Sequence, residues 1–236
     1  MKLTLSRLLP LALLSLALVS EAAPIGQFSR LSKNKQAAEY TILTRSKGRI
    51  RITFLRPDVV RIEATSRRTF ADPQNDPKKA QIVVEAARSP VPVAIQEDGQ
   101  TVAFSTAALV LKLSKADCRM QLLKPDGQVL WTEAQPLDIG DSTVQALASH
   151  PDERFYGGGQ QNGYFAHQGT KIAIRADGNW NEGGHPNPAP FYMSSAGYGI
   201  LRNTFSPGSY DFSATDAVRL VHEEKRFDAY CFVGAS

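Results

Sequence analysis

The residues best suited to chemistry lie between 153 and 212, a stretch rich in glycine, asparagine and aromatic residues. Within it, residues 177–182 read D-G-N-W-N-E, which sets two carboxylates, two carboxamides and an indole close together. Planar amides and carboxylates hydrogen-bond neighbouring sugar hydroxyls, and an aromatic face covers the apolar side of a sugar ring. The pattern therefore predicts that Asp177, Asn179 and Trp180 contact a carbohydrate.

The same residues also suit a long turn with no ligand. Asp and Asn side chains commonly accept hydrogen bonds from their own backbone in turns. Gly178 permits a sharp change of chain direction, and the prolines from 186 to 190 stiffen the return. Composition by itself favours the turn, so the sugar-contact prediction needs further support.

Other chemistries lack the spacing that they require. Gly157–Gly159 is not followed by the Lys-Ser/Thr of a phosphate loop, and these glycines instead predict closely packed or bulged strands. We expect no metal and no cofactor, because no histidine belongs to a close ligand pair. A mutarotase-like reaction needs a His and a Glu that converge in a pocket; His167 with Glu182 is the candidate pair, and no spacing rule links the two. The four histidines are His150, His167, His185 and His222.

The composition is that of a soluble globular protein. The chain has 236 residues, of which 42% are hydrophobic and 21% are charged, and this length suits one large all-β domain as well as two small ones. The net charge of +4 is not gathered in a long basic run, so nucleic acid is not an expected partner. Cys118 and Cys231 are either a disulfide or two buried thiols, and the sequence leaves that choice open.

The N-terminus has the pattern of a secretory signal peptide. Lys2 and Arg7 precede an apolar run over 8–19, and Ser20-Glu21-Ala22 supplies small residues for cleavage after Ala22. The run is too short to span a bilayer comfortably. We therefore expect residues 1–22 to be removed from an exported protein, periplasmic or secreted, with no membrane association afterwards.

The rest of the chain predicts an all-β framework. Residues 23–38 are polar and are expected to form a flexible lead-in. Strict alternation over 49–55 and 60–64 predicts strands with one buried face. A surface loop is expected at 67–79, and 143–149 suggests a helical turn. Further short strands are expected at 91–95, 101–105, 109–113, 120–123, 129–131, 217–221 and 227–233. Many short strands separated by turn signals indicate a β-sandwich or barrel.

Three motifs together resemble a known family. They are F-Y-G-G-G-Q-Q-N-G at 155–163, N-W-N-E-G-G-H-P-N-P-A-P-F-Y at 179–192, and G-Y-G-I-L-R-N-T at 197–204 followed by Y-D-F. They resemble the N-terminal domain of glycoside hydrolase family 31, which includes retaining α-glucosidases, α-xylosidases and α-galactosidases. The resemblance implies a galactose-mutarotase-like antiparallel β-sandwich over residues 39–236, of the kind that precedes a (β/α)₈ catalytic barrel.

The resemblance also implies roles for particular residues. In this family a loop of the sandwich lines the sugar pocket of the barrel, and Asp177 is the best match to its sugar-contacting aspartate, with Asn179 and Trp180 beside it. The catalytic nucleophile lies in a W-x-D-M-N-E motif of the barrel, which this sequence lacks. We therefore expect a domain truncated before the barrel, with no catalytic residue of its own. It would serve an exported retaining α-glycosidase that acts on α-glycosides. The alternative is a free-standing carbohydrate-binding module.

Overall fold

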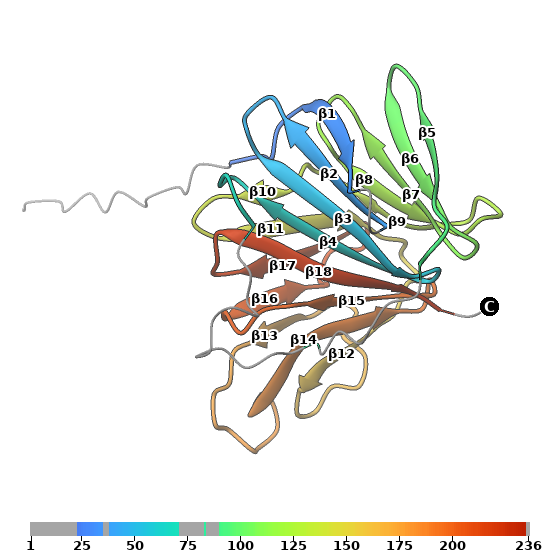
Figure 1. Ribbon diagram of the computed structural model, residues 1–236. Coiled ribbons are helices and arrows are strands. Elements are labelled where there is room, and N and C mark those ends of the chain that lie inside the picture. Colours follow the sequence, from blue (N-terminus) through green and yellow to red (C-terminus); the bar gives the residue numbers. More distant parts are fainter. Residues whose placement is uncertain (1–22, 35–37, 71–82, 84–89, 235–236) are drawn as a thin grey trace, which may run out of the picture.

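Two antiparallel β-sheets make up the fold (Figure 1). The computed structural model describes residues 23–34, 38–70, 83 and 90–234. All the secondary-structure elements in these residues are β-strands. This confirms the all-β sandwich expected from the sequence. The predicted signal peptide at 1–22 and most of the loop expected at 67–79 lie outside the described residues.

The first sheet has eight strands in the order β1-β2-β3-β4-β18-β15-β14-β12. At its centre β4, an early strand, pairs with β18, the last strand of the described residues. The strands are β1 (Phe28–Lys33), β2 (Glu39–Thr44), β3 (Arg49–Arg56), β4 (Val59–Thr65), β12 (Phe155–Gln160), β14 (Asn187–Ser194), β15 (Tyr198–Arg202) and β18 (Arg226–Val233).

The second sheet has ten strands and follows the path β13-β16-β17-β11-β9-β8-β7-β6-β5, with β10 paired to β11. At one end of the molecule lie β12, β13 and β14, opposite β5 and β6 (Figure 1). The strands are β5 (Ala94–Glu97), β6 (Thr101–Ser105), β7 (Val110–Ser114), β8 (Met120–Leu123), β9 (Val129–Glu133), β10 (Asp138–Ile139), β11 (Thr143–Ala148), β13 (Lys171–Ile174), β16 (Gly208–Asp211) and β17 (Ala217–His222).

The hydrophobic core lies between the two sheets. Ile50 and Ile52 of β3 are fully buried, as the alternation of that strand predicted. Tyr40 of β2 meets Phe104 of β6 across the core, with ring centroids 4.9 Å apart. Aromatic rings of this size each bury roughly 150–250 Å², so such pairs dominate the packing of the two sheets.

Residues 143–149 do not form the expected helical turn; residues 143–148 are strand β11, and that prediction was wrong. Thr143, Gln145 and Leu147 are buried and alternate with more exposed neighbours. The period of two was hidden because two of the three inward-facing side chains are polar.

The prediction of a flexible lead-in at 23–38 was also wrong for the residues of this segment that the structure describes. Phe28–Lys33 is strand β1, which pairs with β2 at the edge of the first sheet. Upstream of it, Ile25 is buried, and its N–H donates to the carbonyl of Leu137 at 2.9 Å. Main-chain hydrogen bonds hold this segment, and its polar composition gives no sign of them.

Cys118 and Cys231 are two buried free thiols, which decides the choice that the sequence left open. Burial raises the pKa of each thiol to about 12, so both stay protonated near neutral pH. Neither thiol has the character of a nucleophile.

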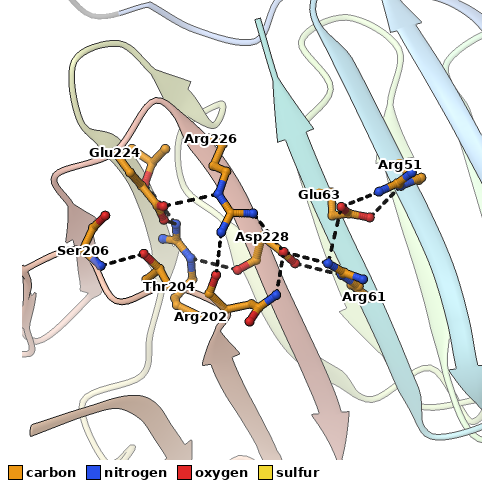
Figure 2. A network of polar contacts seen from close by, with 11 residues as sticks. Arg51, Arg61, Glu63, Arg202, Thr204, Ser206, Glu224, Arg226 and Asp228 are labelled. Atoms are coloured by element: carbon orange, nitrogen blue, oxygen red, sulfur yellow. Dashed lines mark hydrogen bonds and ion pairs between the residues drawn. The ribbon is translucent and has the colours of Figure 1, made fainter. Parts of the chain in front are cut away.

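A network of charged side chains crosses the first sheet (Figure 2). Arg61 of β4 donates two hydrogen bonds to Asp228 of β18, at 2.9 and 2.8 Å, and both residues are buried. Asn203 adds a further donor to Asp228 at 2.9 Å. On the other side Arg51 of β3 pairs with Glu63 of β4. Two-point pairing of this kind offsets the cost of burying the charges.

We predict that Asp228→Asn destabilises the fold strongly. The substitution leaves the Arg61 guanidinium buried beside a neutral amide, and breaking a buried pair typically costs about 3–5 kcal/mol. Asp141→Asn is the control, because Asp141 pairs with Lys225 on the surface, where the loss of an ion pair changes the stability far less. Denaturant titration measures both, and equal midpoints for the two variants would contradict the prediction.

Glu133 of β9 is a buried carboxyl with no cation among its hydrogen-bond partners in the described residues. It accepts hydrogen bonds from the Met120 N–H at 2.9 Å and the Gln145 side-chain amide at 3.0 Å. Burial raises the pKa of Glu133 to about 7, and these two donors only partly oppose it. The carboxyl is therefore neutral in mildly acidic solution.

This carboxyl should make the fold less stable as the pH rises. The pKa of Glu133 lies above its ordinary value of 4.5 only in the folded chain, so its stabilising contribution is complete below pH 4.5 and is lost as the pH rises to about 7. The loss should amount to about 3 kcal/mol. Denaturant midpoints across this range should fall in the wild type and fall less in Glu133→Gln. The control is Glu97→Gln, a change on the exposed strand β5. If the midpoint of Glu133→Gln falls with pH as much as that of Glu97→Gln, the prediction is wrong.

Candidate functional site

Three glycines shape the chain as it approaches the candidate site. Gly157, Gly158 and Gly159 in β12 all have positive φ, and the pairing of β12 with β14 shifts register there. A Cβ on Gly159 would lie 2.3 Å from the main-chain nitrogen of Ala189, and one on Gly157 would lie 2.7 Å from the carbonyl oxygen of Phe191. The glycines therefore form a bulge against β14, as their sequence suggested, and not a phosphate loop.

The 175–186 loop carries the three predicted sugar contacts. It leaves the second sheet at β13 and enters the first sheet at β14, so it crosses the end of the sandwich. Asp177 accepts a hydrogen bond from the Asn179 N–H at 2.9 Å, and Asn179 accepts one from the Asn181 N–H at 3.0 Å. Two consecutive Asx turns thus organise the loop, which is the turn that composition favoured.

His185 closes the loop onto Asp177. Its main-chain N–H lies 3.1 Å from both carboxylate oxygens of Asp177. Burial alone would raise the pKa of Asp177, but the N–H groups of Asn179 and His185 outweigh that effect and lower it. Asp177 is therefore ionised at neutral pH, and its carboxylate is held in one orientation.

A second loop is joined to the first by main-chain hydrogen bonds. The N–H of Asn162 donates to the carbonyl of Gly184 at 2.9 Å, and the N–H of Gly183 donates to the carbonyl of Asn162 at 3.0 Å. The side-chain amide of Asn162 also donates to the carbonyl of Asn181. These bonds set the 161–166 segment beside the 175–186 loop.

The two loops expose aromatic side chains. Trp180 is 68% exposed and Phe165 is 87% exposed, with Tyr164 also on the surface. The ring of Phe165 lies 5.5 Å from that of Tyr156, which comes from β12. Single exposed apolar residues are common, so these rings are candidates for ligand contact only together with the polar groups of the two loops.

The structure thus brings Asp177, Asn179 and Trp180 together on one exposed loop, with the carboxylate and the carboxamide already used in its turns. Sequence reasoning missed Asn162 and Phe165, which lie in a separate motif. Their signal was the Q-N-G-Y-F run after the glycines, but nothing in the sequence shows that it pairs with residues 181–184.

His167 and Glu182 do not form an acid–base pair. His167 is buried, its Nε2 is 2.8 Å from the carbonyl oxygen of Gly157, and its ring stacks on Phe212. Glu182 is exposed on the loop. In the part of the chain that the structure describes, no group of three or more His, Cys, Asp or Glu side chains is placed to hold a metal. Within the same residues, no helix is long and apolar enough to cross a membrane.

Gly184→Ala should disrupt the loop. A Cβ on Gly184 would lie 2.1 Å from the carbonyl oxygen of Asn179, so the two turns would have to separate. We expect a changed Trp180 fluorescence spectrum and a destabilisation of about 1–3 kcal/mol, as for other overpacked sites. Gly99→Ala is the control, since nothing lies within 4 Å of its added Cβ. The same spectrum and stability in both variants would contradict the prediction that Gly184 holds the loop together.

Comparison with known proteins relates this fold to a known domain family. The sequence profile of the glycosyl hydrolase 31 N-terminal galactose mutarotase-like domain matches residues 49–211. A search of curated protein sequences finds no match.

Several solved structures share the fold. The GH31 dextranase FjDex31A of Flavobacterium johnsoniae is 18% identical, with a TM-score of 0.78 over 90% of this chain and 27% of the dextranase chain. A GH31 α-xylosidase from a soil metagenome is 16% identical, with a TM-score of 0.70 over 88% of this chain and 33% of the other. The cycloalternan-forming enzyme of Listeria monocytogenes is 16% identical, with a TM-score of 0.70 over 91% of this chain and 21% of the other.

At these identities the likeness is one of fold, and this chain spans a third or less of each relative's length. The profile match, in contrast, covers more than half of this chain and includes the glycine bulge, both loops and β14. The chain therefore belongs to the glycosyl hydrolase 31 N-terminal galactose mutarotase-like domain family.

Proposed function

We propose that this chain is the substrate-loop domain of an exported retaining α-glycosidase, and that Asp177, Asn179 and Trp180 contact an α-linked sugar at the rim of its pocket. The observation that carries the proposal is the 175–186 loop, which holds an ionised carboxylate in place and leaves Trp180 68% exposed beside it. A fixed acceptor next to an exposed aromatic face matches the two devices that bind sugars.

The sugar class is chosen from the relatives. The dextranase was solved with isomaltotriose and with glucose, and the α-xylosidase was solved with xylose. These ligands belong to those proteins, but they support an α-glucoside or α-xyloside as the first probe for this one. Isomaltotriose is the longest of the three and covers the largest part of a pocket rim.

The proposed role is binding, not bond cleavage. A retaining mechanism needs a nucleophilic carboxylate and an acid roughly 5–5.5 Å apart. The sequence has no W-x-D-M-N-E motif, which in this family holds the nucleophile on the (β/α)₈ barrel. The barrel is therefore the proposed partner of the loop. The proposal of export rests on the signal-peptide pattern at 1–22.

The test is an NMR titration of the chain with isomaltotriose. We expect shifts of the backbone amide signals of the 175–186 loop and of the Trp180 indole, with an affinity weaker than about 1 mM because the loop forms only one wall of a site. The backbone amide signals report the affinity in the variants as well. Trp180→Ala should weaken the affinity by about fivefold or more, the usual cost of removing a central tryptophan. Phe205→Ala is the control, because Phe205 is equally exposed, at 68%, on a different loop.

Three results are distinguishable. Weak binding lost only in Trp180→Ala supports the rim contact. Binding tighter than about 1 mM by the chain alone favours the alternative of a free-standing carbohydrate-binding module, for which Phe165 would extend the aromatic surface. No shift at any sugar concentration, or equal loss in Trp180→Ala and Phe205→Ala, overturns the proposal.

A further inference from the structure

A chain of side-chain amides runs along the edge of the first sheet, where β12 is the outermost strand. Nδ2 of Asn187 donates to Oε1 of Gln160 at 3.1 Å, and Nε2 of Gln160 donates to Oδ1 of Asn162 at 3.1 Å. Nδ2 of Asn162 then donates to the carbonyl oxygen of Asn181 at 3.0 Å. These three side chains, the amide chain, therefore connect the first residue of β14 to the residue that follows Trp180 in the candidate loop.

The main chain fixes the direction of the amide chain. A carbonyl oxygen only accepts hydrogen bonds, so the atom that Asn162 turns towards Asn181 must be its nitrogen. The oxygen of Asn162 then accepts from the nitrogen of Gln160, and the oxygen of Gln160 accepts from the nitrogen of Asn187. Each amide is thus held in one orientation, although Gln160 and Asn187 are exposed.

The glycine bulge brings the two exposed amides together. Gln160 is the Cα partner of Asn187 across β12 and β14. A Cβ on Gly159 would lie 2.5 Å from the carbonyl oxygen of Asn187, so a side chain there would push the strands apart. Main-chain pairing already joins the strands, and the exposed bond between Asn187 and Gln160 adds little to stability because water competes for both groups. Ordering the long Gln160 side chain also costs rotamer entropy. Fold stability therefore gives little reason for this ordered pair.

The exposed amides keep groups that suit sugar hydroxyls. A carboxamide has two N–H donors and an oxygen with two lone pairs. Within the described residues, the amide chain uses one N–H and one lone pair of Gln160, and one N–H of Asn187. Each of the two side chains therefore keeps a donor beside an acceptor. A pair of neighbouring sugar hydroxyls presents the same combination.

The exposed amides lie close to the proposed sugar contacts. The N–H of His185 is 3.1 Å from both carboxylate oxygens of Asp177. Asn187 follows His185 by two residues, a span of at most about 7 Å even in an extended chain. When one sugar unit contacts Asp177, the unit linked to it can therefore reach the amide chain.

We infer that Gln160 and Asn187 form a second sugar subsite beside the 175–186 loop, so that the ligand is an α-linked oligosaccharide and not a single sugar. The inference rests on the proposed function, which supplies the first subsite at Asp177, Asn179 and Trp180. One sugar unit lies against the loop, and the hydroxyls of the next unit bond to the two exposed amides. Asn162 positions these amides and ties them to the loop.

The test compares isomaltotriose with glucose in NMR titrations of the whole chain. Isomaltotriose should shift the side-chain amide signals of Gln160 and Asn187, and it should bind more tightly than glucose. Asn187→Ala and Gln160→Ala should each weaken the isomaltotriose affinity by about threefold to tenfold, the effect of one or two hydrogen bonds. The affinity of glucose for the loop, read from the backbone amides of 175–186, should not change. Gln96→Ala is the matched control, because Gln96 is exposed on β5, at the opposite end of the sandwich (Figure 1).

The failure of this inference differs from the failure of the proposed function. Equal losses for glucose and isomaltotriose in Asn187→Ala would mean that the amides only hold the loop, and would overturn the second subsite. Unchanged isomaltotriose affinity in both Asn187→Ala and Gln160→Ala would overturn it as well. In either case Trp180→Ala still decides the sugar contact at the loop. If Trp180→Ala has no effect while Asn187→Ala weakens binding, the loop contact is refuted and the contact at the amides stands.

Discussion

The two-point pair between Arg61 and Asp228 is the interaction on which the first sheet depends. The two residues are 167 positions apart, and they join β4 to β18 at the centre of that sheet. Burying both charges is costly, and the cost is offset only while both carboxylate oxygens meet donors. The pair therefore selects one alignment of β18 against β4. Through β18 it also places β15 and β14, and β14 carries the end of the candidate loop.

A second constraint acts at the end of the sandwich, where the chain crosses between sheets. The bulge at Gly157–Gly159 lets β12 pass closer to β14 than any side chain would allow. The segment that follows is then near enough for Asn162 to bond with residues 181–184. Bonds to this neighbouring segment and the Asx turns of the loop itself therefore order the loop together. None of these bonds uses the Trp180 side chain, so the ordered loop can leave Trp180 exposed.

The sequence predicted the fold where the buried side of a strand is apolar. The apolar positions of β3 and β4 are Ile, Phe, Val and Ala, so their alternation was plain. The expected solvent-facing side of β4 is also buried, because Arg61 and Glu63 lie in the charged network. The prediction failed at β11, where Thr143 and Gln145 face the core, and at β1, an edge strand held by its backbone. For the site, residue types predicted the candidates at 177–180. The contact of His185 with Asp177 depends on the path of the chain around the loop, and no spacing rule encodes that path.

The geometry of Asp177 is compatible with both a turn and a sugar contact. An ionised carboxylate offers about four lone-pair sites. The His185 N–H has a single proton, so its two 3.1 Å contacts are one shared bond to Asp177. With the Asn179 N–H, the carboxylate then accepts from two main-chain donors and keeps acceptor sites for others. A sugar hydroxyl is such a donor. The bonds that make Asp177 part of a turn are therefore also the bonds that would hold it in position to accept from a sugar.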